Sequence, residues 1–210
     1  MRPSGRPALL VALLAAAASL TACASGAVRE DAGPMRSYAV PGFGALALEV
    51  PTDWKDSVEA AEGGISARAI TFQPPSGHAF VVKVLAGGNR KSQPGFNSPA
   101  RMRLIVERQG YRLLRSAMEP TLIVVPLAGA AARGFYFTLT DKVAVEHPTT
   151  TGDYPRLTQG VASVGGLLVS FSIYFREPVA PEREAALAMI ASARHLASPG
   201  SAPPPGGTTR

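Results

Sequence analysis

The chain has 210 residues, which is room for about one domain of ordinary size. Hydrophobic residues make up 46% and charged residues 17%, so the chain can bury one core and is not disordered as a whole. The single cysteine excludes a disulfide framework and a cysteine-cluster metal site. The three histidines are scattered along the chain and do not suggest a histidine-rich metal site, so we expect no cofactor.

The N-terminus has the pattern of an export signal. A short basic start with Arg2 and Arg6 precedes an uncharged apolar run, residues 8–20. This run would be roughly 20 Å long as a helix, which is too short to cross a bilayer core and fits the apolar region of a signal peptide. The run ends in Leu20-Thr21-Ala22-Cys23, which resembles the lipobox of bacterial lipoproteins.

The lipobox resemblance implies that residues 1–22 are removed and that Cys23 is acylated, which would anchor the chain in a membrane. The only thiol would then be consumed, so no nucleophilic cysteine is expected. Ala24, rather than aspartate, follows the cysteine. In lipoproteins of Gram-negative bacteria this implies export to the outer membrane, on its periplasmic face.

The charge balance gives no reason to expect nucleic acid as a partner. After Cys23 the chain keeps 19 Lys and Arg against 15 Asp and Glu, a net charge of +4. We interpret this excess as small and spread along the chain.

Composition divides the remainder into three parts. Residues 23–35 are small and polar and are predicted to be a flexible tether. Residues 36–197 are predicted to fold as one domain, and residues 198–210, rich in Pro, Gly, Ser and Thr, as a disordered tail.

Strands are expected first. Residues 38–40 and 46–50 flank a hairpin turn at Pro41-Gly42-Phe43-Gly44, and further strands are predicted over residues 65–73 and 80–85. A helix is then predicted from a Ser98 cap to Gly110, because apolar residues recur there at helical spacing.

The second half repeats this order. Strands are expected over residues 122–127, 132–140, 157–164 and 167–176, the last two joined by a Gly165-Gly166 turn. From Leu167 to Phe175 apolar and mostly polar residues alternate, as in a strand with one buried face. A final helix is predicted from Pro181 to His195, with acidic residues at its start and Arg194 and His195 at its end.

Because strands and helices do not alternate one by one, a doubly wound parallel sheet is not expected. The sequence predicts an α+β domain, with an antiparallel β-sheet and helices packed on it.

Two stretches of the sequence resemble the PsbP-like sandwich superfamily. The first is the segment from Leu48 to Trp54, which ends in a Pro51-x-x-Trp54 step, and the second is Gly134 to Asp141 together with Leu157 to Gly160. The resemblance implies an antiparallel sheet between helices and a binding or accessory role. It transfers no site residue.

A polar constellation between two late strands is a candidate site. His147, with Asp141 or Asp153, could bind a divalent metal, or His147 could act as a base. The alternative is a solvated loop, which must be polar because its backbone faces water.

A shallow ligand groove is the second candidate. We expect it to be lined by polar residues on and beside those late strands: Thr138, Thr140, Asp141, Tyr154, Arg156, Thr158 and Gln159. The alternative is an ordinary polar face of cross-strand pairs.

Two further features have a functional and a structural interpretation. Arg101, Arg108 and Arg112 share one side of the first helix, which either faces anionic lipid or an acidic partner or is simply solvated. Trp54 either stacks on a ligand or packs at the edge of the core, and we favour the core.

Three functions remain open at this point. The favoured one is a lipid-anchored, non-enzymatic binding or accessory module of the bacterial cell envelope, with an envelope protein as a possible partner. The second is an envelope hydrolase or metal-dependent enzyme that uses the His147 loop. The third is a structural spacer without a specific ligand.

Overall fold

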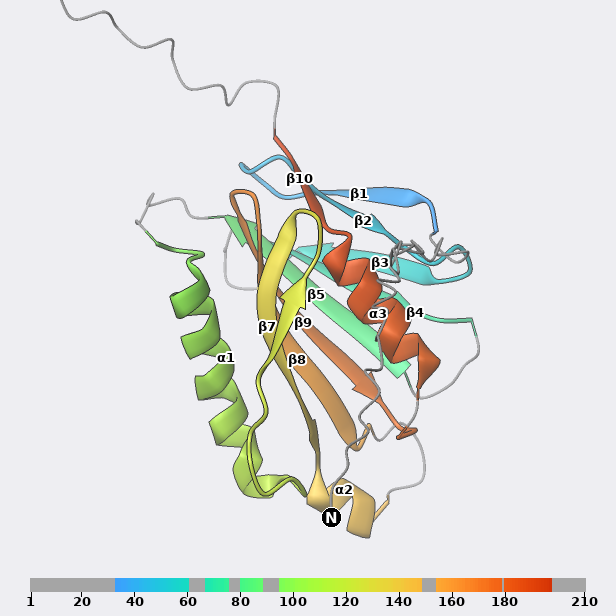
Figure 1. Cartoon of the computed structure of the whole chain (residues 1–210). Helices are drawn as coiled ribbons and strands as arrows, with labels where there is room; N and C mark the ends of the chain where they lie inside the picture. The colour runs from blue at the N-terminus through green and yellow to red at the C-terminus, as the bar shows by residue number, and fades with distance from the viewer. Residues whose placement is uncertain are drawn as a thin grey trace, which may run out of the picture. The chain divides into compact units, whose positions relative to one another are not determined.

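A computed structural model describes most of the predicted domain (Figure 1). The described residues are 33–60, 67–75, 80–88, 95–148, 154–178 and 180–197. The predicted signal peptide, Cys23, the tail after residue 197 and Asp153 lie outside them. Within these ranges no helix is both long and apolar enough to span a membrane.

The larger of two sheets has seven antiparallel strands, in the order β3-β4-β5-β9-β8-β7-β6. Neighbours in the chain are mostly neighbours in the sheet, as is usual for antiparallel meanders. The strands are β3 Lys55–Ala60, β4 Ala67–Gln73, β5 Phe80–Gly88, β6 Val125–Ala128, β7 Ala132–Thr140, β8 Arg156–Val164 and β9 Leu167–Phe175.

Strand β9 lies in the middle of this sheet and confirms the predicted alternation. Its odd-numbered residues from Leu167 to Phe175 are all buried, and the residues between them are only half-buried. The predicted hairpin is also confirmed, because Val164 of β8 pairs with Leu167 of β9 across Gly165-Gly166. Gly165 has a φ of 57°, which a glycine adopts without strain.

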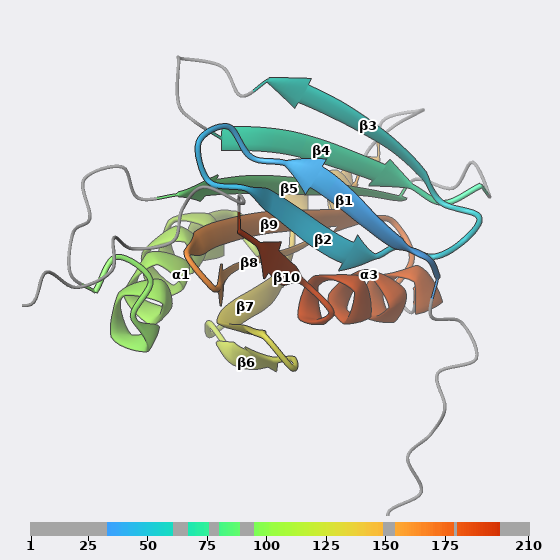
Figure 2. The same cartoon turned by 90° about the horizontal axis from the view of Figure 1, so that it is seen from above.

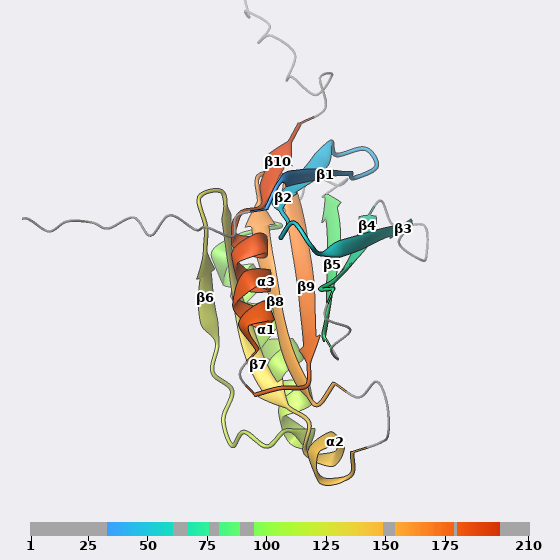
Figure 3. The ribbon, with the colours of Figure 1, turned by 90° about the vertical axis from the view of Figure 1, so that its right-hand side faces the viewer.

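A small sheet and a helix cover one face of the large sheet (Figures 2 and 3). The small sheet has the order β1-β2-β10, with β1 Met35–Ala39, β2 Ala45–Glu49 and β10 Arg194–Leu196, and the helix is α3 Pro181–Ala191. Their apolar side chains join the buried face of β4, β5, β8 and β9 in the main core. Trp54 belongs to this core, since it is 5% exposed and its ring centroid lies 5.6 Å from that of Phe80.

The opposite face of the large sheet is partly covered by helix α1, Pro99–Leu113, and the short 3-10 helix η2, Leu114–Ser116. Ser98 caps α1 as predicted, by accepting a hydrogen bond from the backbone N–H of Arg101. Met102 and Val106 of the helix pack on Phe137, Leu139 and Val161 in a second core. The predicted class, an α+β fold with helices packed on an antiparallel sheet, is therefore confirmed.

The predicted end of α1 is wrong. The helix does not stop at Gly110 but continues for three residues to Leu113. Gly110 is buried, and a Cβ atom there would lie 2.5 Å from a methyl carbon of Leu122. The glycine therefore lets Leu122 pack closely against the helix and does not end it.

The predicted end of the last helix is also wrong. Helix α3 ends at Ala191, and His195 lies on strand β10, which pairs with β2. The Nε2 atom of His195 is 2.6 Å from the carbonyl oxygen of Phe43, and its Nδ1 accepts a hydrogen bond from the N–H of Gly166. His195 thus links the small sheet to the β8–β9 turn and does not complement a helix dipole.

Besides η2 and β10, strand β3 and helix α2 were not predicted, and β6 is shifted from its predicted position. Strand β3 is almost wholly exposed at a sheet edge, so its sequence lacks apolar alternation. Helix α2, Lys142–Glu146, occupies part of the segment predicted as a loop. The strand expected over residues 122–127 is β6 and begins at Val125.

Gly160, in the middle of β8, should not tolerate a side chain. A Cβ atom there would lie 2.4 Å from Cζ of Phe171 and 2.5 Å from the carbonyl oxygen of Phe135. Because a backbone oxygen cannot move aside, we expect Gly160→Ala to lower the free energy of unfolding by about 2 kcal/mol, measured by urea denaturation.

Gly166→Ala is the matched control, since the nearest atom to its Cβ would be 3.5 Å away, an ordinary contact. We expect this variant to unfold within about 0.5 kcal/mol of the parent chain. Equal losses in the two variants would contradict the close packing around Gly160.

Candidate functional site

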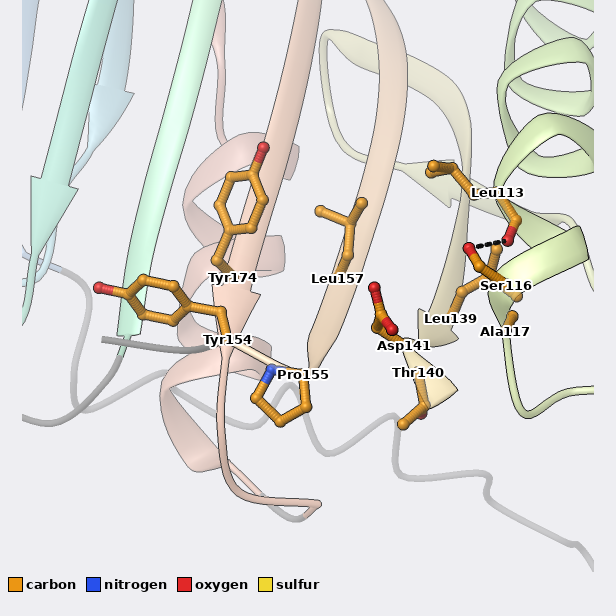
Figure 4. A pocket seen from close by; sticks show the side chains of 10 residues that line it. All are labelled: Leu113, Ser116, Ala117, Leu139, Thr140, Asp141, Tyr154, Pro155, Leu157 and Tyr174. Carbon is orange, nitrogen blue, oxygen red and sulfur yellow. Dashed lines mark hydrogen bonds between the residues drawn. The ribbon is translucent and has the colours of Figure 1, made fainter. Parts of the chain in front are cut away.

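A cavity of about 170 Å³ lies between the end of helix α1 and the ends of strands β7, β8 and β9 (Figure 4). Such a volume holds several water molecules or one small chemical group. Its wall consists of Leu113, Ser116, Ala117, Leu139, Thr140, Asp141, Tyr154, Pro155, Leu157 and Tyr174.

Backbone hydrogen bonds hold three chain segments around the cavity. The segment after η2 pairs with the end of β7, because the N–H of Met118 donates to the carbonyl oxygen of Thr140 at 2.9 Å. The N–H of Asp141 donates to the carbonyl oxygen of Pro155 at 2.7 Å, which brings the start of β8 to the same place. The N–H of Thr140 is bound by Glu119 Oε2 at 2.9 Å. These hydrogen bonds hold the segment after η2, the end of β7 and the start of β8 in place around the cavity.

Asp141 is the one charged side chain among the lining residues. Its Oδ1 accepts hydrogen bonds from the backbone N–H groups of Val143 at 2.8 Å and Ala144 at 3.2 Å, so it is the N-cap of α2. Figure 4 shows the carboxylate beside Leu157 and the end of β7. The capping bonds hold the carboxylate through Oδ1, and no hydrogen bond to Oδ2 is found among the described residues.

Two tyrosines form the side of the cavity away from α1 (Figure 4). The ring centroids of Tyr154 and Tyr174 are 6.0 Å apart with planes at 59°. The Nζ of Lys83 lies 6.0 Å from the Tyr174 centroid, a cation–π distance. With the leucines opposite, the wall has an apolar side, an aromatic side and one carboxylate, which fits a small amphipathic group rather than an ion.

The structure places three of the seven expected groove residues in this wall: Thr140, Asp141 and Tyr154. The other four lie elsewhere. Thr138 and Thr158 hydrogen-bond to each other, with their Oγ1 atoms 2.8 Å apart, and Thr158 is fully buried.

Arg156 and Gln159 also have their own partners. The guanidinium of Arg156 donates to the carbonyl oxygen of Arg176. The Nε2 of Gln159 lies 3.4 Å from Oγ of Ser172, a long hydrogen bond across β8 and β9. These two side chains belong to cross-strand contacts.

The His147 constellation is not assembled among the described residues. His147 is exposed at the end of α2, where its backbone N–H donates to Val143, and it does not line the cavity. Asp153 lies outside the described residues. No group of three or more His, Cys, Asp or Glu side chains in the described ranges could hold a metal ion.

A second polar cluster lies between strands β1 and β3. Arg36 of β1 forms an ion pair with Asp56 of β3 and donates a 2.9 Å hydrogen bond to the carbonyl oxygen of Trp54. Burial of the Tyr38 hydroxyl, with the neighbouring Asp56 carboxylate, raises the pKa of this tyrosine. Tyr38 therefore stays neutral and is part of the core.

Sequence reasoning missed most of the cavity wall. Leu113, Leu139 and Leu157 have the pattern of core residues, and Tyr174 that of the outer face of β9. Only the pairing of β7, β8 and β9 and the position of η2 bring them together, and no local pattern contains that information.

A scan against protein-family models and a search of curated proteins both give no match. Among solved structures, a protein of Bacteroides thetaiotaomicron is similar, with 14% identity and a TM-score of 0.48 over 79% of this chain and 49% of that one. This chain therefore spans about half the length of that protein.

The solution structure of cyanobacterial PsbP from Synechocystis sp. PCC 6803 is also similar, with 12% identity and a TM-score of 0.47. That match covers 81% of this chain and 96% of the other. This is a likeness of fold alone, to a protein of the PsbP-like fold that was expected above. At these values no residue's role is carried over from either structure.

The contact between Thr138 and Thr158 predicts a non-additive pair of substitutions. Thr138→Val or Thr158→Val alone should lower the free energy of unfolding by about 1 kcal/mol, because the remaining hydroxyl loses its partner. The double valine variant should lose less than the two single losses together, since it has no unpaired hydroxyl. Chemical denaturation measures all three, and additive losses would show that the two hydroxyls are not coupled.

Proposed function

We propose that this chain is a lipid-anchored, non-enzymatic binding or accessory module of the bacterial cell envelope, on the periplasmic face of the outer membrane. The observation that carries the proposal is Leu20-Thr21-Ala22-Cys23 directly after an uncharged apolar run and a basic start. Several acyl chains on one cysteine would hold the protein at a membrane stably, because each buried CH₂ contributes about 0.8 kcal/mol.

The cavity supports a binding role rather than that of a spacer. Its wall combines apolar side chains, two tyrosines and the fixed carboxylate of Asp141, the combination by which proteins orient a small ligand or a partner's side chain.

The anchor is tested by labelling with a fatty acid in a bacterial host and by mass spectrometry of the membrane fraction. The parent chain should carry the label and begin at an acylated Cys23, and Cys23→Ala should be unlabelled and keep its precursor mass. Ser25→Ala, two residues along, is the control and should be labelled like the parent. A free thiol at Cys23 in the parent would refute the anchor.

The binding role is tested by a photoreactive benzoylphenylalanine placed at Ser116, in the cavity wall, in chain expressed in the envelope. We expect an adduct of defined mass at this position and none at the exposed Asp53, which lies in a turn outside the cavity. Leu157→Trp should fill the cavity and reduce the adduct at Ser116 at least about tenfold, a change of about 1.4 kcal/mol in occupancy. Equal adducts at both positions, or none, would favour the spacer.

A further inference from the structure

The positive charge of the chain is concentrated on one helix. Helix α1 and η2 together carry Arg101, Arg103, Arg108, Arg112 and Arg115 against the single acidic residue Glu107, a net charge of +4. The chain after Cys23 has the same net charge, with 19 basic and 15 acidic residues. All other residues together are therefore neutral, and the expectation of an excess spread along the chain is wrong.

Four of these arginines have no acidic partner in the described part of the chain. Glu107 forms its ion pair with Arg103, at 2.8 Å, on the flank of the helix. No carboxylate of a described residue lies within ion-pair distance of the other four, all of them exposed: Arg101, Arg108, Arg112 and Arg115. Their charges are thus available to an external anion.

These arginines share the side of α1 that lies opposite its buried residues and are all exposed. The side of the helix opposite the buried Met102, Val106 and Gly110 carries six residues at helical spacing. They are residues 101, 104, 108, 111, 112 and 115. Leu104 and Tyr111 lie among the arginines and are 58% and 60% exposed. We call these six residues the α1 outer face.

The chemistry of the α1 outer face fits the surface of an anionic phospholipid bilayer. Guanidinium groups bind phosphate through two parallel hydrogen bonds, and the side chains of tyrosine and leucine enter the boundary between headgroups and acyl chains. An acidic polymer would also attract the arginines, but it offers no apolar phase for Leu104 and Tyr111.

We propose that the α1 outer face docks on anionic phospholipid headgroups, with Arg108 and Arg112 as principal contacts and Leu104 and Tyr111 inserted between the headgroups. This contact does not require acylation at Cys23, although in an acylated chain both would act on the same membrane.

The test uses residues 23–210 with Cys23→Ser, so that no lipid is attached. Both core clusters lie between Tyr38 and Ala193, so this protein retains every residue of both cores. Its partition into vesicles of phosphatidylcholine and phosphatidylglycerol is compared with that into pure phosphatidylcholine. We expect at least about tenfold stronger partition into the anionic vesicles, and loss of the difference at high salt.

Arg108→Gln with Arg112→Gln should reduce this partition about 25-fold, since each arginine near the surface contributes about fivefold. Lys55→Gln with Arg176→Gln removes the same charge from exposed residues elsewhere and should stay within about threefold of the parent. Equal losses in the two pairs would indicate attraction by net charge alone and would refute docking through α1.

A second readout separates a membrane from an acidic macromolecule. In a Leu104→Trp variant the fluorescence emission should shift to shorter wavelength with anionic vesicles and not with polyglutamate, because only the vesicle offers an apolar phase. Tight binding to polyglutamate or DNA without partition into vesicles, or no shift with vesicles, would overturn the proposal. Neither outcome bears on acylation, which is measured separately at Cys23.

Discussion

The antiparallel pairing of β8 with β9 is the constraint on which both cores depend. The turn at Gly165-Gly166 places Val164 opposite Leu167, and from there each pair along the two strands is determined. A slip of one residue would turn every side chain to the wrong face, so Phe171 and Ile173 would leave the main core. The same register places Gly160 opposite Phe171, where only a glycine leaves room for the ring.

The register also determines where a ligand could bind. Helix α1 packs on β7 and β8, and its last turn and η2 reach the ends of these strands without closing the space beside Tyr174. The hydrogen bonds of Thr140 and Asp141 to the flanking segments hold this end open, with the carboxylate fixed by helix α2. Because helix α1 covers only part of the sheet face, a cavity remains where the helix ends.

The sequence predicted those elements whose burial follows a regular period. Strand β9 alternates over its whole length, and Ser98 with Pro99 marks the start of α1. It did not predict β3, which is exposed and paired on one side only, so neither period nor hydrophobicity distinguishes it from a loop. His195 was misplaced because local charge favoured a helix end, whereas pairing with β2 and a hydrogen bond to Phe43 determine its conformation.

The candidate site was less predictable than the fold, for a related reason. Thr138 and Thr158 were expected to face a groove because they are polar, yet they satisfy each other inside the sheet. Leu113 and Leu157, which do form the cavity, are apolar and give no signal of a site. Polarity of single residues therefore did not distinguish side chains that bind each other from those open to a ligand.

The positive charge is distributed unevenly over the chain, and packing of the cores does not explain this distribution. A soluble domain needs charge on its surface, but solubility alone does not require the basic residues to gather on α1 while the rest of the chain is balanced. Gathering four arginines that have no acidic partner among the described residues raises their mutual repulsion, which an anionic surface would relieve. An acyl anchor alone would restrict the distance of the domain from the membrane but not its orientation, because a tether leaves it free to rotate. A second contact through α1 would remove that freedom and hold the cavity, which Leu113 of the same helix lines, close to the lipid surface.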